Sequence, residues 1–185
     1  AQGLPILCIC LNAQFSGSYQ SALNAAEELG EEYPEAQVEV VDSTLATVLQ
    51  GLFVLEAVRL RDRNLTLEEA VERLKPIRAS GRIFFTTSDL EYLRHGGRIG
   101  RAAAATGALL KVKPLIGYQD AGLISDGIAQ GRKKSLVRVR ELFFRYLSRE
   151  GIDLNRYQVA TGFGLDGEEH QDFAKTVYDG LLALG

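Results

Sequence analysis

Hydrophobic positions along the chain alternate between short apolar runs and longer stretches with helical spacing. Residues 5–11 are apolar throughout, as in a strand that is covered on both faces. Apolar side chains then recur every three or four residues from Tyr19 up to Gly30, where we expect the helix to end. The same alternation predicts further strands at 38–41, 83–87, 113–118, 123–129 and 157–161, and further helices at 45–61, 66–78, 88–95, 102–112, 136–147 and 169–184.

This order of elements predicts an α/β fold with two domains. Strands that alternate with helices in the first part predict a parallel sheet with flanking helices. In the second part, Asp120-Ala121-Gly122 separates two strands and predicts a β-hairpin within a mixed α/β sheet. We place the boundary near Ser80, with residues 1–80 as the first domain and 81–185 as the second.

Composition narrows the class of protein. Hydrophobic residues make up 46% of the 185 residues, which is enough for a substantial core, and charged residues make up 24%. The formal net charge of −3 gives no overall indication of nucleic-acid binding. No apolar run approaches the roughly 18 residues that a membrane-spanning helix needs, so we predict no integral membrane segment.

The two cysteines, Cys8 and Cys10, lie two positions apart in the first predicted strand. This spacing puts them on one face of the strand and too close in sequence for an ordinary disulfide. His95 and His170 add no recognisable metal-ligand spacing, so we predict no metal site. We interpret the cysteines as buried, reduced thiols, which favours a cytoplasmic setting.

The turn between the first strand and the first helix is a candidate anion site. Ligands of open α/β sheets bind at the carboxyl ends of strands, and a helix N-terminus offers unpaired N–H groups. Asn12 and the Ser16-Gly17-Ser18 segment fall in this turn, and Asp42-Ser43 follows the neighbouring strand. A carboxylate or a phosphate would fit here. The alternative is that these residues are ordinary helix caps.

Two arginines are further candidates for binding an anion. Gly96-Gly97 predicts a left-handed helix end that carries Arg98 on a constrained turn, and arginine suits bidentate binding of carboxylate or phosphate. Arg132 opens a basic segment before a helix, which could meet an anion or an acidic partner. Both arginines could instead be solvated surface residues. Because there is no Gly-x-Ser-x-Gly elbow and no Walker loop, we predict no catalytic residues.

Five segments, in this order, resemble the DegV family of bacterial proteins. They cover nearly the whole chain, and together they are far more specific than any one of them. The segments are residues 15–22 (FSGSYQSA), 40–43 (VVDS), 88–99 (SDLEYLRHGGRI), 109–116 (LLKVKPLI) and 131–134 (GRKK).

The resemblance implies a non-catalytic lipid carrier. DegV-type proteins have two α/β domains that enclose one long-chain fatty acid, and several serve as the binding subunit of a fatty-acid kinase, which phosphorylates the bound carboxylate. By this resemblance the carboxylate would be held by Asn12, Ser16, Gly17, Ser18 and Arg98, while Arg132 would face the kinase or the phosphate. The acyl tail would be lined by Phe84, Leu93, Leu109 and Ile116, for which plain core packing is the alternative. No cofactor is implied beyond the fatty acid itself.

The chain also departs from the family pattern. The family usually begins with a further βα segment that carries a hydroxyl-rich loop and ends with a histidine-containing block, and neither is found here. Asn12-Ala13 stands where the family has two serines. We therefore expect a chain truncated at both ends, with a partial first domain and a second domain without its final strand block. One alternative hypothesis is a small-molecule enzyme or phosphoryl-transfer subunit that binds an anion. Another is a truncated domain without a ligand.

Overall fold

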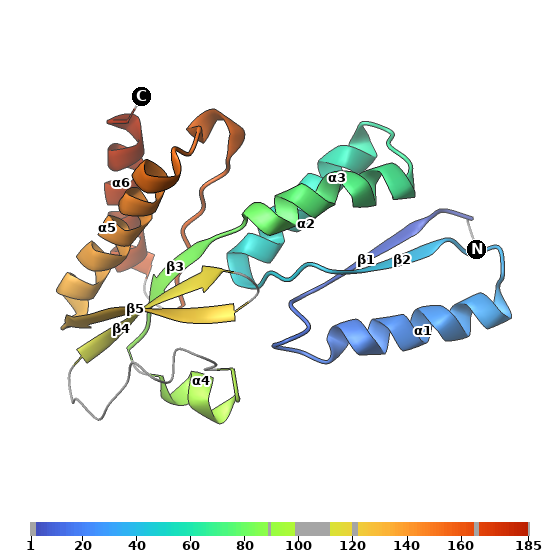
Figure 1. Ribbon diagram of the computed structural model, residues 1–185, viewed down its shortest axis with the longest axis horizontal. Helices are drawn as coiled ribbons and strands as arrows, with labels where there is room; N and C mark the ends of the chain where they lie inside the picture. Colours follow the sequence, from blue (N-terminus) through green and yellow to red (C-terminus); the bar gives the residue numbers. More distant parts are fainter. Residues whose placement is uncertain (1–2, 89, 99–111, 120–121, 165–166, 185) are drawn as a thin grey trace. The chain divides into compact units, whose positions relative to one another are not determined.

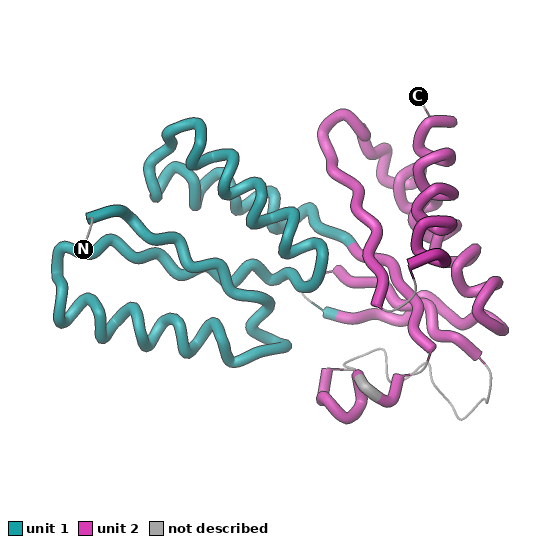
Figure 2. The backbone as a smooth tube through the Cα atoms, turned by 180° about the vertical axis from the view of Figure 1, so that it is seen from behind, with its two compact units in different colours: residues 1–82, 120–122 teal, residues 83–119, 123–185 magenta. Residues whose placement is uncertain are grey.

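A computed structural model describes residues 3–88, 90–98, 112–119, 122–164 and 167–184 (Figure 1). The chain divides into two compact units, which Figure 2 draws in different colours. Unit 1 comprises residues 1–82 and 120–122, and unit 2 comprises residues 83–119 and 123–185. Each unit combines strands with helices, which confirms the predicted α/β fold class.

Unit 1 is built on a two-stranded parallel sheet. Its strands pair in register, with Cys10 opposite Asp42, as the alternation of strands and helices predicted. Helix α1 packs on both strands, and α2 packs against α3. The elements, in order, are β1 (Ile6–Cys10), α1 (Ser18–Glu32), β2 (Val38–Asp42), α2 (Thr47–Asp62) and α3 (Leu67–Ser80).

Helix α1 runs past the glycine at which we expected it to end. It continues through Gly30 to Glu32 and is followed by Tyr33 with φ −132° and ψ 78°. The residue before a proline is disfavoured in the helical region, and Pro34 comes next. The expected end at Gly30 is therefore wrong, because the proline decides where this helix ends.

Helix α3 begins with the predicted capping box. Thr66 Oγ1 accepts from the Glu69 backbone N–H at 3.2 Å, and the Glu69 carboxylate accepts from the Thr66 backbone N–H at 2.9 Å. Hydrogen bonding of the Glu69 carboxyl by the Thr66 backbone N–H, and less strongly by the Thr66 side chain, holds the pKa of this carboxyl below its ordinary value. The box satisfies two N–H groups that the helix leaves without intrahelical partners.

Replacing Thr66 with alanine is expected to lower the free energy of unfolding by about 1 kcal/mol, because the cap on Glu69 N–H is lost. Urea-induced unfolding followed by circular dichroism measures the change. Thr66→Ser keeps the hydroxyl and is expected to stay close to the original stability. Equal losses in the two variants would show that the hydroxyl contributes nothing.

Unit 2 is built on a three-stranded sheet in the order β3-β4-β5. Strands β3 and β4 are antiparallel, β4 and β5 form the predicted hairpin, and α5 packs on β3 and β4. The helix predicted at 102–112 lies outside the described residues, except Val112, which begins β4. The elements are β3 (Ile83–Thr86), α4 (Glu91–His95), β4 (Val112–Gln119), β5 (Gly122–Gln130), α5 (Arg132–Glu150), a 3₁₀ turn (Leu154–Arg156) and α6 (Gly167–Leu182).

The strand predicted at 157–161 does not form. Tyr157 is extended, with φ −126° and ψ 152°, but residues 157–161 belong to no strand. Tyr157 and Val159 remain 43% and 40% exposed. A run of apolar and β-branched residues favours an extended backbone, yet a strand also needs a neighbour with which to pair. The predicted strand is therefore wrong for the described structure.

Asp126 on β5 is a carboxylate with a buried oxygen. Among the described residues its Oδ2 has no hydrogen-bond partner. It lies over Gly117 on β4, where a Cβ atom would be 2.3 Å from Oδ2, so only a glycine leaves room for it. Burial raises the pKa of the Asp126 carboxyl, and the positive charge of Arg149 acts weakly in the opposite direction.

The raised pKa predicts a pH-dependent effect of Asp126→Asn. An ordinary aspartate ionises near pH 4, so the unfolded chain loses this proton before the folded chain does. The original protein therefore loses stability from this group as the pH rises through that range. We expect the stability of Asp126→Asn, relative to the original protein, to be higher at pH 7 than at pH 3. Urea unfolding at both pH values tests this, and a difference that does not change with pH would contradict it.

Candidate functional site

The loops that follow β1 and β2 are tied together at the carboxyl ends of the two strands. Asp42 Oδ1 accepts from the backbone N–H of Ala13 at 3.2 Å and from that of Thr44 at 2.8 Å. The Ser43 backbone N–H donates to the Cys10 carbonyl at 2.9 Å. One carboxylate thus fixes both loops, and Asp42-Ser43 has a structural role at this edge of the sheet.

Asn12 organises the turn after β1 from a fully buried position. Its backbone N–H donates to the Leu45 carbonyl at 2.9 Å, and its Oδ1 accepts from the Gln14 N–H at 2.7 Å. Its carbonyl oxygen accepts from Phe15 and Ser16. This set of bonds is typical of asparagine in tight turns. A direct contact between Asn12 and a ligand remains a prediction.

The Ser16-Gly17-Ser18 segment presents the positive end of α1. Ser16 Oγ accepts from the Ser18 N–H at 3.1 Å, and Gly17 and Ser18 are exposed. The first turn of α1 contains no acidic residue that would offset the helix dipole. A Cβ atom at Gly17 would meet nothing within 4 Å. The segment therefore offers an open surface with the polarity that an anion requires.

The segment that leads from β2 into the first residue of α2 has two features that the sequence analysis missed. Thr44 and Thr47 have φ values of 53° and 56°, a region that β-branched residues rarely adopt. Arg78, from α3, donates from Nη1 to the Asp42 carbonyl at 2.9 Å. No local sequence signal marks either feature. Strain of this kind is held in place by surrounding structure and is concentrated at functional sites.

Arg98 lies in unit 2, just after α4. Gly97 has φ 70°, so the predicted left-handed helix end is present. The Arg98 backbone N–H donates to the Leu93 carbonyl at 2.9 Å, and its guanidinium folds back to donate to the Gly96 carbonyl. Arg98 is exposed. Its predicted contact with a carboxylate stays a prediction.

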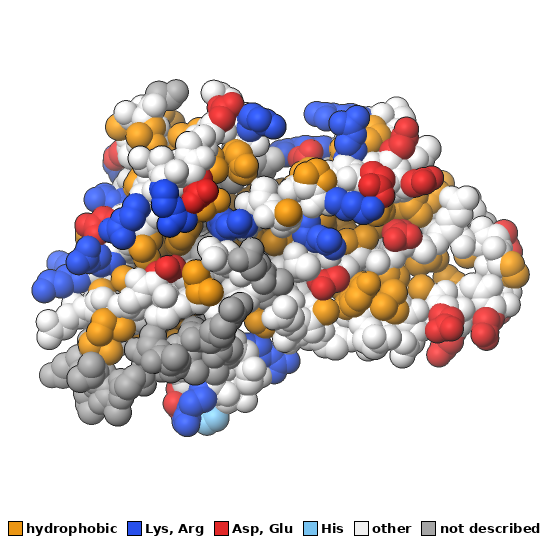
Figure 3. Space-filling model, in the orientation of Figure 1, with side chains coloured by type: hydrophobic (Ala, Val, Ile, Leu, Met, Phe, Trp, Pro, Cys, Tyr) orange, Lys and Arg blue, Asp and Glu red, His pale blue; other side chains and the backbone are white. Residues whose placement is uncertain are grey.

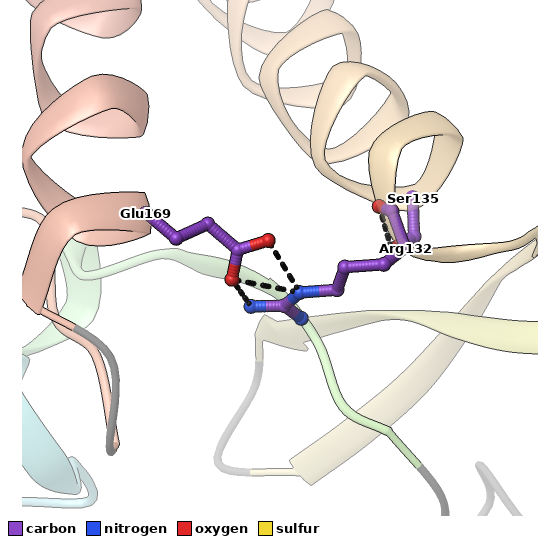
Figure 4. A network of polar contacts seen from close by, with 3 residues as sticks. All are labelled: Arg132, Ser135 and Glu169. Carbon is purple, nitrogen blue, oxygen red and sulfur yellow. Dashed lines mark hydrogen bonds and ion pairs between the residues drawn. The ribbon is translucent and has the colours of Figure 1, made fainter.

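Arg132, the first residue of α5, is engaged by a carboxylate of the chain itself (Figure 4). Its Nε and Nη2 donate to the Glu169 carboxylate, with Nη2 to Oε2 at 2.8 Å. The two side chains are 34% and 30% exposed, so the ion pair is only partly screened by water. This bidentate geometry is the one with which arginine holds a ligand carboxylate.

An aromatic stack extends the Arg132–Glu169 pair. The Arg132 guanidinium carbon lies 5.2 Å from the centroid of the Phe163 ring, and this ring stacks on His170 at 5.9 Å between centroids. His170 Nε2 is 3.0 Å from Thr161 Oγ1. Sequence reasoning missed this cluster, because its members come from three separate stretches of the chain.

Two of the predicted tail-lining residues lie on opposite faces of the second sheet. Phe84 is paired with Gly117 and Phe85 with Ile116, and paired residues of antiparallel strands share a face. Phe84 packs against the cluster of Leu115, Ala129 and Val139, and Ile116 is 1% exposed. Leu93 lies in α4 and Leu109 outside the described residues. A tunnel on one face of this sheet would contact Phe84 or Ile116, but not both.

Basic side chains are concentrated on α5, over which lysines and arginines gather in Figure 3. The helix contains seven basic and two acidic residues, although the whole chain has a net charge of −3. Arg138 and Arg149 form exposed ion pairs with Glu141 and Glu150. The positive charge that remains in excess on α5 makes this helix suitable for binding an anionic partner.

Comparison with known proteins decides the family. The DegV family, described as a family of uncharacterised proteins, matches residues 1–180. This chain belongs to the DegV family. A DegV domain-containing protein of Clostridium perfringens is 35% identical over 159 residues, which are 85% of this chain and 53% of the relative. The chain thus spans about half the length of the curated DegV relatives that it matches.

Solved structures similar to this chain include fatty-acid-binding proteins. A stearic acid-binding protein from Eubacterium ventriosum is 39% identical, with a TM-score of 0.90, and the match covers 96% of this chain and 60% of that one. The fatty acid kinase B3 protein of Streptococcus pneumoniae, loaded with linoleic acid, has a TM-score of 0.67 over 76% of this chain and 50% of that one. At 23% identity the second likeness concerns the DegV fold alone.

The described residues contain neither a membrane-spanning helix nor a cluster of metal-binding side chains. In that part of this DegV chain, no helix is long and apolar enough to cross a membrane. The same residues contain no group of three or more histidine, cysteine, aspartate or glutamate side chains that could hold a metal ion.

Proposed function

We propose that this chain binds a long-chain fatty acid as a non-catalytic carrier and presents its carboxylate to a partner kinase. The observation that carries the proposal is the match to the stearic acid-binding protein, with a TM-score of 0.90 over 96% of this chain. The resemblance to the DegV family, several members of which serve as the binding subunit of a fatty-acid kinase, supports the kinase as partner. The cytoplasmic setting stays a prediction.

In this proposal the fatty-acid carboxylate is bound at the α1 N-terminus. Gly17 and Ser18 are exposed there, and no acidic residue in the first turn opposes an anion. The buried Asn12 side chain stabilises this turn, because its Oδ1 accepts a hydrogen bond from the Gln14 N–H. The Ser16 Oγ accepts a hydrogen bond from the Ser18 N–H and so stabilises the conformation of this segment. The contact of Arg98 with a carboxylate, which the family resemblance implies, stays a prediction.

We assign the acyl tail to the sheet face that carries Ile116, with Leu93 as further lining. The predicted role of Leu109 stays a prediction, because this residue lies outside the described residues. On the opposite face, the ring of Phe84 lies 5.5 Å from that of Tyr146 and 6.4 Å from that of Phe143, so side chains of α5 already fill the space beside it. Phe84 is accordingly a core residue in this proposal. Burial of each methylene of the tail contributes about 0.8 kcal/mol.

Arg132 is proposed to face the kinase or the transferred phosphate. Its guanidinium is held by Glu169, so contact with an anion requires Glu169 to be displaced. Displacement is feasible because Glu169 also lies in the first turn of α6, where a carboxylate is stabilised by the helix dipole. A developing acyl phosphate carries more negative charge than a single carboxylate and would compete for the arginine.

The proposal is tested by what the purified chain carries. After expression in a bacterial host and mild purification, extraction with organic solvent and mass spectrometry are expected to yield a long-chain fatty acid, near one per chain. A protein that carries no fatty acid, and takes up none when it is offered, would contradict the proposal.

A further inference from the structure

The two thiols of β1 form a close pair that the proposed function does not use. Cys8 Sγ and Cys10 Sγ are 3.9 Å apart on one face of the strand. Cys10 is buried, and Cys8 is half-buried. The Cys10 thiol also donates to the Ser18 carbonyl, with Sγ to O at 3.8 Å. The pair therefore lies directly beside the first residue of α1.

Strand geometry disfavours a direct bond between these sulfurs. Residues two apart in a strand have Cα atoms separated by about 6.7 Å. This is close to the upper limit of about 6.8 Å for disulfides, most of which are shorter. Both cysteines are free in the structure. The strand thus keeps two reduced sulfurs side by side and opposes their oxidation to a disulfide.

The spacing suits a single bridging ion. Tetrahedral zinc binds thiolates at about 2.3 Å, which places two of its sulfur ligands about 3.8 Å apart. The observed 3.9 Å matches this separation without any movement of the strand. We propose that Cys8 and Cys10 form a two-sulfur site for a thiophilic d¹⁰ cation of the zinc type, with water in its remaining positions. This inference does not rest on fatty-acid binding.

Binding at this site exchanges protons for the metal. Two S–H bonds break, two metal–sulfur bonds form, and both protons pass to solvent, with no change of oxidation state. Loss of the Cys10 proton would remove its bond to the Ser18 carbonyl. An ion at the thiol pair would therefore act on the turn that carries the candidate anion site.

Titration with Cd²⁺ tests the site, because cadmium thiolates absorb in the ultraviolet through charge transfer from sulfur. The reduced protein is expected to bind one Cd²⁺ per chain with this absorption. Cys8→Ser and Cys10→Ser are each expected to bind at least about tenfold more weakly, since one of the two sulfur bonds is lost.

Absence of the charge-transfer band in the original protein would overturn the inference, as would equal affinity in either variant. Circular dichroism establishes that each variant is folded. Cys8 is only half-buried, so Cys8→Ser keeps the test decisive if Cys10→Ser fails to fold. Bound fatty acid is measured separately on the same samples, so the result bears on the thiol pair alone.

Discussion

Gly17→Asp is expected to weaken fatty-acid binding about a hundredfold while leaving the fold intact. The new carboxylate would lie at the exposed turn to which we assign the fatty-acid carboxylate. Two like charges about 4 Å apart near a protein surface repel by about 4 kcal/mol, or nearly a thousandfold in affinity. Because Gly17 is exposed, solvent reduces this repulsion, and we expect the smaller loss.

The backbone at Gly17 tolerates this change. Its φ of −73° is ordinary for any residue, and a Cβ atom there would meet nothing within 4 Å. Aspartate and asparagine are also favoured caps of helix N-termini. A loss of binding in Gly17→Asp would therefore come from charge and not from unfolding.

Gly17→Asn is the matched control, because it adds a side chain of the same shape without the charge. We expect it to bind within a fewfold of the original affinity. Competition with a fluorescent fatty acid measures both variants under the same conditions. If the aspartate variant bound as tightly as the asparagine variant, the carboxylate would have to be held elsewhere.

Leu74→Ala is expected to lower the free energy of unfolding by about 2–5 kcal/mol, the range for leucines removed from packed cores. Leu74 on α3 is 1% exposed, and the neighbouring α2 buries Phe53, which is 2% exposed. Helices α2 and α3 pack against each other. The cavity left by the missing side chain cannot be filled without moving one of these helices.

Leu55→Ala makes the same chemical change on α2 at a position that is 53% exposed. For Leu55→Ala we expect the free energy of unfolding to fall by less than about 1 kcal/mol, because little of the Leu55 surface is removed from water on folding. Urea unfolding of both variants gives the comparison. Equal losses at the two positions would mean that α2 and α3 do not pack as described.

The first strand, its turn and the α3 cap could be predicted because their signals are local. The apolar run before Asn12 predicted the strand, and the polar turn after it marked the start of α1. The expected burial on both faces is wrong, because only Cys10 of β1 is buried and Ile6 is 50% exposed. Thr66 and Glu69 form a capping box within four residues of sequence. Each feature depends on residues that are neighbours in the chain, so the pattern contains the information that decides it.

Features that depend on distant partners could not be predicted. Glu169 binds Arg132 from 37 residues away, and no pattern near either residue indicates the other. Residues 157–161 have the composition of a strand, but pairing depends on a neighbouring strand. The opposite orientation of Phe84 and Ile116 follows from the β3–β4 register, which apolar composition alone does not determine.

The affinities of this chain for stearic acid and for octadecan-1-ol, which share the same tail, test the proposed carboxylate site most directly. We predict that the acid binds at least about tenfold more tightly, because the α1 N-terminus stabilises its charge. Shortening the acid by two methylenes should weaken binding about fifteenfold, from about 0.8 kcal/mol for each methylene. Equal affinity for acid and alcohol, or no binding of either, would contradict the account.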